Sequence, residues 1–138
     1  MRRLDLEPYI LKNAGGSGKT IIEALEQSIL SESAFGIVLM TPDDIGCSQQ
    51  EYQEDTTKLQ PRARQNVILE MGILIGAIGR DKVAILRKGN IENPSDVSGI
   101  FYISFNNSVI KEAGNSLIKH LKRAGIPIDE GKIITALS

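Results

Sequence analysis

The 138-residue sequence has one cysteine, one histidine and no tryptophan, and aromatic residues make up only 4% of it. A lone Cys47 cannot form an internal disulfide, and Cys47 with His120 cannot build a structural zinc site. The net charge of -1 gives no overall positive field, so neither nucleic acid nor an anionic membrane is an expected partner. Any anion-binding site must therefore be local.

The sequence also has no hydrophobic run long enough to span a bilayer. The longest run, residues 67–79, is too short and contains Glu70. The first residues carry Arg2 and Arg3 and lack the apolar stretch of a secretion signal. Single domains commonly have about 100–150 residues. We therefore expect one cytoplasmic domain.

Short apolar runs alternate with helical segments along the chain. Four runs predict buried strands, at residues 8–11, 35–41, 82–87 and 100–105. The first helix is expected to begin at Thr20, which forms a capping box with Glu23. The second helix is expected to begin near Pro61 and to end at Gly79. This alternation predicts an α/β fold with a parallel sheet.

The last part of the chain predicts one more helix. Residues 109–124 have the apolar spacing of an amphipathic helix, and Gly125 is the expected stop. We therefore expect residues 1–125 to form the domain and residues 126–138 to form a carboxyl-terminal tail.

A glycine-rich segment precedes the first predicted helix. Its end, GGSGKT, is similar to a phosphate-binding loop, in which glycines permit tight turns before Lys and Thr at a helix start. The spacing fails because Asn13 stands where the first glycine is required, and no strand clearly supplies an acid for magnesium. We prefer a glycine-rich connection whose backbone donors lie near a ligand phosphate.

The second predicted helix carries the strongest group of polar residues. Arg62, Asn66 and Glu70 are spaced four apart, which would place them on one side of the helix. Ligands of α/β proteins bind near the carboxyl ends of the strands, so this side is expected to face the pocket. Glu70 stands among apolar residues and has a desolvation cost unless Arg62 or a ligand compensates. A catalytic acid and a structural acid paired with Arg62 or Arg64 fit the pattern equally well.

Other polar residues are weaker candidates. Asp43 and Asp44 follow a predicted strand, a position that suits ligand contact, but Pro-Asp-Asp is also common in turns. His120 stands between lysines on the last helix and is expected to be solvated. Cys47 has no histidine nearby that would activate it as a nucleophile.

Four separated segments form a set that spans most of residues 8–125. They are Gly15-Gly16 followed by TIIE at 20–23, VLMTPDD at 38–44, RARQNVILEMG at 62–72 and PSDVSGI at 94–100. In these segments the chain resembles the TIR-like domain family, predicted nucleotide-binding proteins related to the TIR domains fused to STING in bacterial antiphage systems. The resemblance implies a flavodoxin-like fold, with helices on both faces of a parallel sheet.

The resemblance also implies an activity. Glu70 corresponds to the family's catalytic glutamate, which acts in cleaving the bond between nicotinamide and ribose in NAD. We expect NAD or a related nucleotide as the ligand and substrate, no metal or other cofactor, and activation by self-association through TIR-like surfaces. The further substrate contacts that we expect are Gly15, Gly16, Lys19, Asp43, Arg62 and Asn66.

Two features depart from the family's pattern. Lys19 stands where an arginine is expected, and the family's first strand and helix have no counterpart. Without that strand, residues 8–11 and 35–41 would have an empty position between them in the sheet. NAD cleavage is therefore expected of a full-length parent rather than of this chain alone. Two rival functions are a non-catalytic nucleotide-binding TIR interaction module and a nucleoside deoxyribosyltransferase, which shares the layout and uses a glutamate near a ribose.

Overall fold

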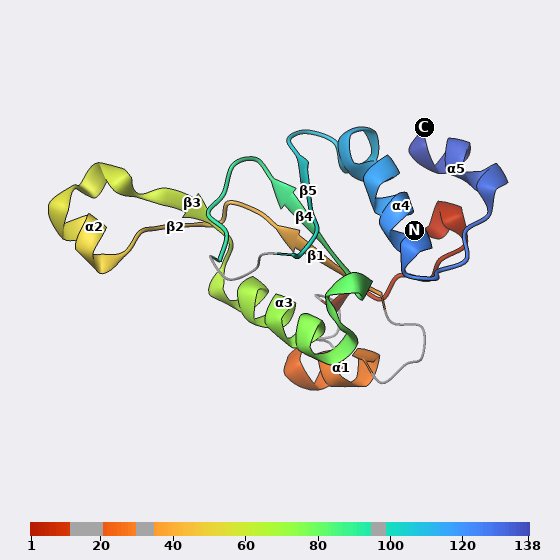
Figure 1. The fold of residues 1–138 in the computed structure, drawn as a ribbon, viewed down its shortest axis with the longest axis horizontal. Coiled ribbons are helices and arrows are strands. Elements are labelled where there is room, and N and C mark those ends of the chain that lie inside the picture. The colour runs from red at the N-terminus through yellow and green to blue at the C-terminus, as the bar shows by residue number, and fades with distance from the viewer. Residues whose placement is uncertain (12–20, 30–34, 95–98) are drawn as a thin grey trace.

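A computed structural model describes residues 1–11, 21–29, 35–94 and 99–138 (Figure 1). Its centre is a parallel sheet of three strands in the order β1-β4-β5. The strands are β1 (Gly36–Met40), β4 (Val83–Lys88) and β5 (Tyr102–Phe105). In register, Gly36 lies opposite Val83 and Ile85 lies opposite Tyr102. The three later predicted strands and their parallel pairing are therefore confirmed.

The first predicted strand is wrong, because residues 8–11 form no strand. Tyr9 and Ile10 are exposed, and within the described residues β1 is the edge of its sheet. A strand needs a neighbour that accepts and donates ladder hydrogen bonds, and no described strand lies beside β1 on that side. An apolar run alone does not form a strand without that neighbour.

Helix α3 (Gln65–Ile78) covers one face of the sheet. Alternate residues of a strand point to opposite faces, so Val83 and Ile85 of β4 face α3. They pack with Met71, which is 2% exposed, and with the two inward residues of β1. These inward residues are Val38 and Met40.

The opposite face is covered by the π-helix η5 (Val109–Ala113) and by α4 (Gly114–Arg123). Leu86 of β4 and Phe105 of β5 pack there against Leu117 and Leu121. This arrangement confirms the predicted helix at residues 109–124. With α3 on one face and α4 on the other, the described residues have an α/β fold with helices on both faces of a parallel sheet, as predicted (Figure 1).

Residues 44–62 project away from the sheet, and we call them the arm (Figure 1). The arm consists of the antiparallel pair β2 (Asp44–Gly46) and β3 (Gln60–Arg62), joined by α2 (Gln49–Glu54) and the 3-10 turn η3 (Thr56–Lys58). The predicted helix start near Pro61 is therefore wrong. Pro61 pairs with Ile45 in the arm, and α3 begins only after Arg64.

The two ends of the chain pack together (Figure 1). The 3-10 turn η1 (Arg2–Leu4) lies against α5 (Glu130–Leu137), which forms within the segment predicted as a tail. The guanidinium of Arg3 donates to the carbonyl of Thr135 at 3.3 Å, and Lys132 pairs with Asp5. The remaining elements are α1 (Ile21–Ile29) and the turn η4 (Arg80–Lys82). No helix in the described parts of the chain has the length and apolar character needed to cross a membrane.

Candidate functional site

Glu70 lies in the second turn of α3 and is partly buried. Its neighbour Met71 is in the core and Leu69 is 53% exposed, so Glu70 stands between the packed and the open sides of the helix. It forms no hydrogen bond or ion pair with the described residues. The structure therefore does not support the alternative of a structural acid paired with Arg62 or Arg64.

Those two arginines have other contacts. The Nε of Arg64 lies 3.5 Å from a carboxylate oxygen of Asp43. The guanidinium of Arg62 lies against the backbone of Gly46, where a Cβ atom would collide with it. Neither cation neutralises Glu70.

Asp43 lies three residues after the end of β1, in the loop at the carboxyl edge of the sheet. It accepts a hydrogen bond from the hydroxyl of Thr41 and pairs with Arg64, which precedes α3. The two charged side chains are 39% and 65% exposed, so the pair contributes little to stability. Its effect is to connect the loop after β1 with the start of the helix that carries Glu70.

The predicted row of three polar residues on one side of a helix is wrong for its first member. Arg62 belongs to β3. Its backbone lies opposite Asp44 of β2 and forms an isolated parallel β-bridge with the backbone of Glu92. Asn66 is exposed in the first turn of α3, one turn before Glu70. The helix therefore presents an amide and a carboxylate, while the guanidinium belongs to the arm.

The remaining predicted substrate contacts are not placed. Gly15, Gly16 and Lys19 lie outside the described residues, as does Thr20, the predicted cap of the first helix. The described part of the predicted site is therefore the edge that Asp43 forms with the start of α3.

A polar group that was not among the predicted site residues lies between β4 and β5, with Arg87 near the carboxyl end of β4 and Tyr102 at the amino end of β5. Arg87 donates from Nη2 to the hydroxyl of Ser104 at 3.1 Å, and its Cζ lies 5.8 Å from the centre of the Tyr102 ring. The Nε of Arg87 and the hydroxyl of Tyr102 are buried and have no hydrogen-bond partner in the described part of the chain. Burial raises the pKa of Tyr102, and the charge of Arg87 opposes this shift. The indication available in the sequence was a cation that directly follows four apolar residues of a strand.

A small polar hollow lies between the arm and Glu92. It is lined by Gly46, Cys47, Glu51, Lys58, Gln60 and Glu92 and has a volume of about 60 Å³. Pockets for drug-sized ligands have volumes of about 300–1,000 Å³, so this hollow suits a few water molecules rather than a dinucleotide. Glu70 does not line it. In the described ranges, no group of three or more His, Cys, Asp and Glu residues could hold a metal ion.

His120 is not the solvated residue that was predicted. Its ring stacks on Phe101 with centroids 5.0 Å apart and meets the ring of Phe35 edge-on at 5.5 Å. Its Nε2 is buried, and no described residue forms a hydrogen bond with it. The flanking lysines gave a misleading indication, because the preceding and following residues of a helix point to different sides.

Comparison with known proteins places this chain in a family. The profile of the family described as "CAP12/Pycsar effector protein, TIR domain" matches residues 1–107. The chain is 41% identical over 137 residues to protein YuaY of Escherichia coli (strain K12), covering 97% of this chain and 42% of YuaY. It is 34% identical over 120 residues to protein tirC of Dictyostelium discoideum, covering 83% of this chain and 58% of tirC.

A third relative carries a functional name. The chain is 35% identical over 86 residues to the Pycsar effector protein PaPycTIR of Pseudomonas aeruginosa, covering 61% of this chain and 25% of that protein. The chain thus spans between 25% and 58% of the lengths of these three curated relatives.

Proposed function

The chain belongs to the CAP12/Pycsar effector TIR-domain family, and from this membership we propose that it is the NAD-cleaving domain of a cytoplasmic bacterial antiphage effector. The name of PaPycTIR as a Pycsar effector supports the defence role. The observation that carries the catalytic part is Glu70, a partly buried carboxylate on an apolar helix without a partner among the described residues. An acidic side chain in such a place is typical of a functional group.

The proposed reaction breaks the bond between the nicotinamide nitrogen and C1′ of the ribose. The electron pair of that bond goes to the positively charged pyridinium ring, so nicotinamide leaves as a neutral molecule and needs no proton. The ribose gathers positive charge, as in other glycosyl transfers. Water attacks C1′ and releases a proton, which gives ADP-ribose; attack by a hydroxyl of the same molecule would give a cyclic product.

Glu70 is the group that lowers the barrier in this proposal. Its ionised carboxylate accepts hydrogen bonds from the ribose hydroxyls and stabilises the positive charge that develops on the sugar. Asn66 lies one turn earlier on α3 and is proposed to orient the same sugar. Asp43 lies at the same edge of the sheet. Gly15, Gly16, Lys19 and Arg62 are proposed to contact the phosphates.

The decisive experiment measures nicotinamide release from NAD by the full-length protein over a range of protein concentrations, because self-association is proposed to activate it. Glu70→Gln keeps the shape of the side chain and removes its charge, so turnover should fall to background while the unfolding temperature stays nearly constant. Glu26→Gln is the matched control, since Glu26 is exposed on α1. No release at any concentration, or full activity of Glu70→Gln, contradicts the proposal.

A second candidate is a nucleotide-binding interaction module without catalysis. The edge of the sheet favours it, because Ile37 and Leu39 of β1 are 38% and 50% exposed. Exposed apolar strands at a sheet edge are common sites of protein association. Binding of NAD in a titration, without any product in the same sample, would select this function. Turnover of deoxynucleosides but not of NAD would instead select a deoxyribosyltransferase.

A further inference from the structure

Arg87 is a partly buried cation without a carboxylate partner among the described residues. Among the described ranges, its one hydrogen bond to a side chain runs from Nη2 to Ser104, and its Nε is buried without a partner there. Burying a guanidinium donor without an acceptor is unfavourable, because the lost hydrogen bond to water is not replaced. Such a donor is therefore suited to an acceptor that a ligand brings.

Tyr102 adds a second unpartnered group at the same place. Its hydroxyl is buried and has no hydrogen-bond partner among the residues that the structure describes, and its ring lies under the guanidinium of Arg87. The register explains the contact: Ser104 is directly opposite Arg87, and Tyr102 lies two residues earlier on β5, on the same face. The ring and the Ser104 hydroxyl together fix the plane of the guanidinium.

One of these residues, Arg87, lies in the region where α/β folds bind ligands, whereas Tyr102 begins β5, opposite Ile85. Arg87 comes near the carboxyl end of β4 and points to the face that α3 covers, because it alternates with Val83 and Ile85. Glu70 lies in the second turn of α3, the helix over that same face. Ligands of open parallel sheets bind at the carboxyl ends of the strands.

We propose that Arg87 and Tyr102 form an oxyanion subsite that binds the diphosphate of a nucleotide. When a ligand displaces the side chains that bury them, Nε of the guanidinium and the hydroxyl of the phenol donate to two phosphate oxygens, while Ser104 holds Nη2 in place. A planar guanidinium binds phosphate with defined geometry, which a lysine cannot reproduce. The choice of a nucleotide rests on the proposed function, but the anion subsite itself rests on the contacts of Arg87.

The test is a set of calorimetric titrations with three probes: ADP-ribose, inorganic pyrophosphate and adenosine, which lacks phosphate. A hydrogen bond to a charged group contributes enough that Arg87→Gln should weaken ADP-ribose binding by about tenfold or more. Arg87→Lys should lose most of the same affinity because it keeps the charge but not the fork. Tyr102→Phe should weaken ADP-ribose binding less, and adenosine affinity should not change in any of the variants.

Controls separate this subsite from a structural role and from the proposed catalysis. Arg123→Gln removes an exposed arginine from α4, on the other face of the sheet, and should leave ADP-ribose binding unchanged. Glu70→Gln should still bind ADP-ribose in an Arg87-dependent way even if NAD is not cleaved by any form of the protein, so the two proposals fail separately.

Two outcomes overturn the subsite. One is a wild-type protein that binds neither ADP-ribose nor pyrophosphate. The other is unchanged ADP-ribose affinity in Arg87→Lys and Tyr102→Phe, which would assign Arg87 to packing alone. These two mild substitutions decide the matter if Arg87→Gln does not fold.

Discussion

The three-stranded sheet and its covering helices, which we call the body, are stabilised by different interactions from those that stabilise the arm. In the body, Val83, Ala84 and Ile85 of β4 are fully buried, and helices cover both faces of the strand. In the arm, α2 has no buried residue. The large apolar side chains of the arm are exposed to solvent. These exposed side chains are Ile45, Tyr52 and Leu59.

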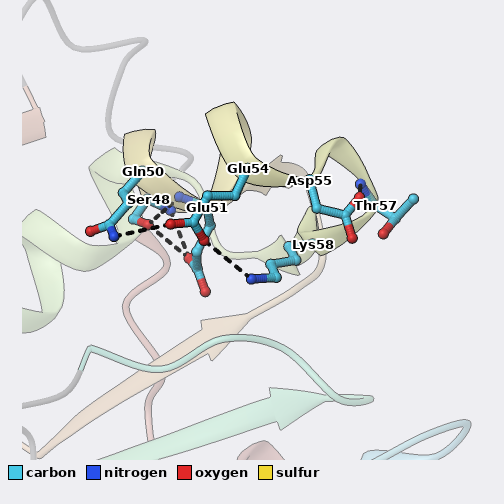
Figure 2. A network of polar contacts seen from close by, with 7 residues as sticks. All are labelled: Ser48, Gln50, Glu51, Glu54, Asp55, Thr57 and Lys58. Atoms are coloured by element: carbon cyan, nitrogen blue, oxygen red, sulfur yellow. Dashed lines mark hydrogen bonds and ion pairs between the residues drawn. The ribbon is translucent and has the colours of Figure 1, made fainter.

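Polar contacts between near neighbours in the sequence maintain the tip of the arm (Figure 2). Ser48 and Glu51 form a capping box, in which the Ser48 hydroxyl accepts from the Glu51 amide at 3.1 Å and the Glu51 carboxylate accepts from the Ser48 amide at 3.1 Å. Asp55 accepts from the amide of Thr57, and Lys58 pairs with Glu54 at 3.6 Å. Such local contacts fix the shape of a segment but add little to the stability of the whole domain.

Stability and function are therefore distributed unevenly over this fold. The body should unfold as one cooperative unit, whereas the arm should open locally at much lower free energy, as a two-stranded ribbon without a core does. The candidate site lies at the carboxyl edge, where the two regions meet. Three predictions follow this contrast in order of expected effect.

The largest effect is expected from a cavity in the body. Leu121 of α4 is 2% exposed, and Leu121→Ala should lower the free energy of unfolding by about 2–5 kcal/mol, because the packed core cannot close around the missing atoms. Leu59→Ala makes the same chemical change on the arm, where the side chain is 42% exposed, and should alter global stability by well under half of that. Denaturant unfolding of both variants measures the difference. Equal losses would show that the arm belongs to the cooperative unit.

An intermediate effect is expected from the junction between β5 and the helices of the body. The Glu112 carboxylate accepts hydrogen bonds from the amides of Ser108, Asn106 and Asn107 at 2.8, 2.7 and 2.9 Å, and these bonds lower its pKa below the ordinary value of 4.5. Because the folded-state pKa is depressed, the stabilisation is present above pH 4.5 and is lost as the pH falls through the folded value.

Glu112→Gln tests this acid dependence. The variant should unfold at a lower temperature than the wild type at pH 7, and the gap should narrow as the pH falls below the ordinary pKa of the carboxyl group. Thermal unfolding at pH 7, 5 and about 3 measures the gap. A gap that does not change with pH would mean that the charge of Glu112 does not contribute.

The smallest effect on the whole molecule is expected from the tip of the arm. Ser48→Ala removes the cap of α2, which should reduce local helix stability by about 1 kcal/mol. Faster amide hydrogen exchange confined to α2, with an unchanged global unfolding temperature, is the expected result. Gln50→Ala removes only one side-chain contact with Glu54 and should change exchange less. A global loss of stability from Ser48→Ala would erase the distinction between arm and body.

The errors of the sequence analysis follow from the same contrast. The runs that became β1, β4 and β5 were predicted correctly because each buries apolar residues against a covering helix, and burial gives a strong apolar pattern. Pro61 suits a helix start equally well, but its pairing with Ile45 in the arm was not visible in the local sequence.

The candidate site was predicted in part. Glu70 was found because a single acid in a long apolar run is unusual, and the structure leaves it without a partner among the described residues. Arg62 was misplaced together with the helix start. Arg87 and Tyr102 were not singled out, because the cluster depends on the register between two strands that are separated by a loop.

The α/β class, three strands, the covering helices and the isolated acid could be predicted from the order of residues alone, because buried elements produce periodic patterns of apolar residues. The positions of the arginine side chains became known only from the tertiary structure, which places Arg62 over Gly46, Arg64 beside Asp43 and Arg87 over Tyr102. Long charged side chains have no preferred place in a sequence pattern. The strands and helices packed around them determine which partner each one reaches.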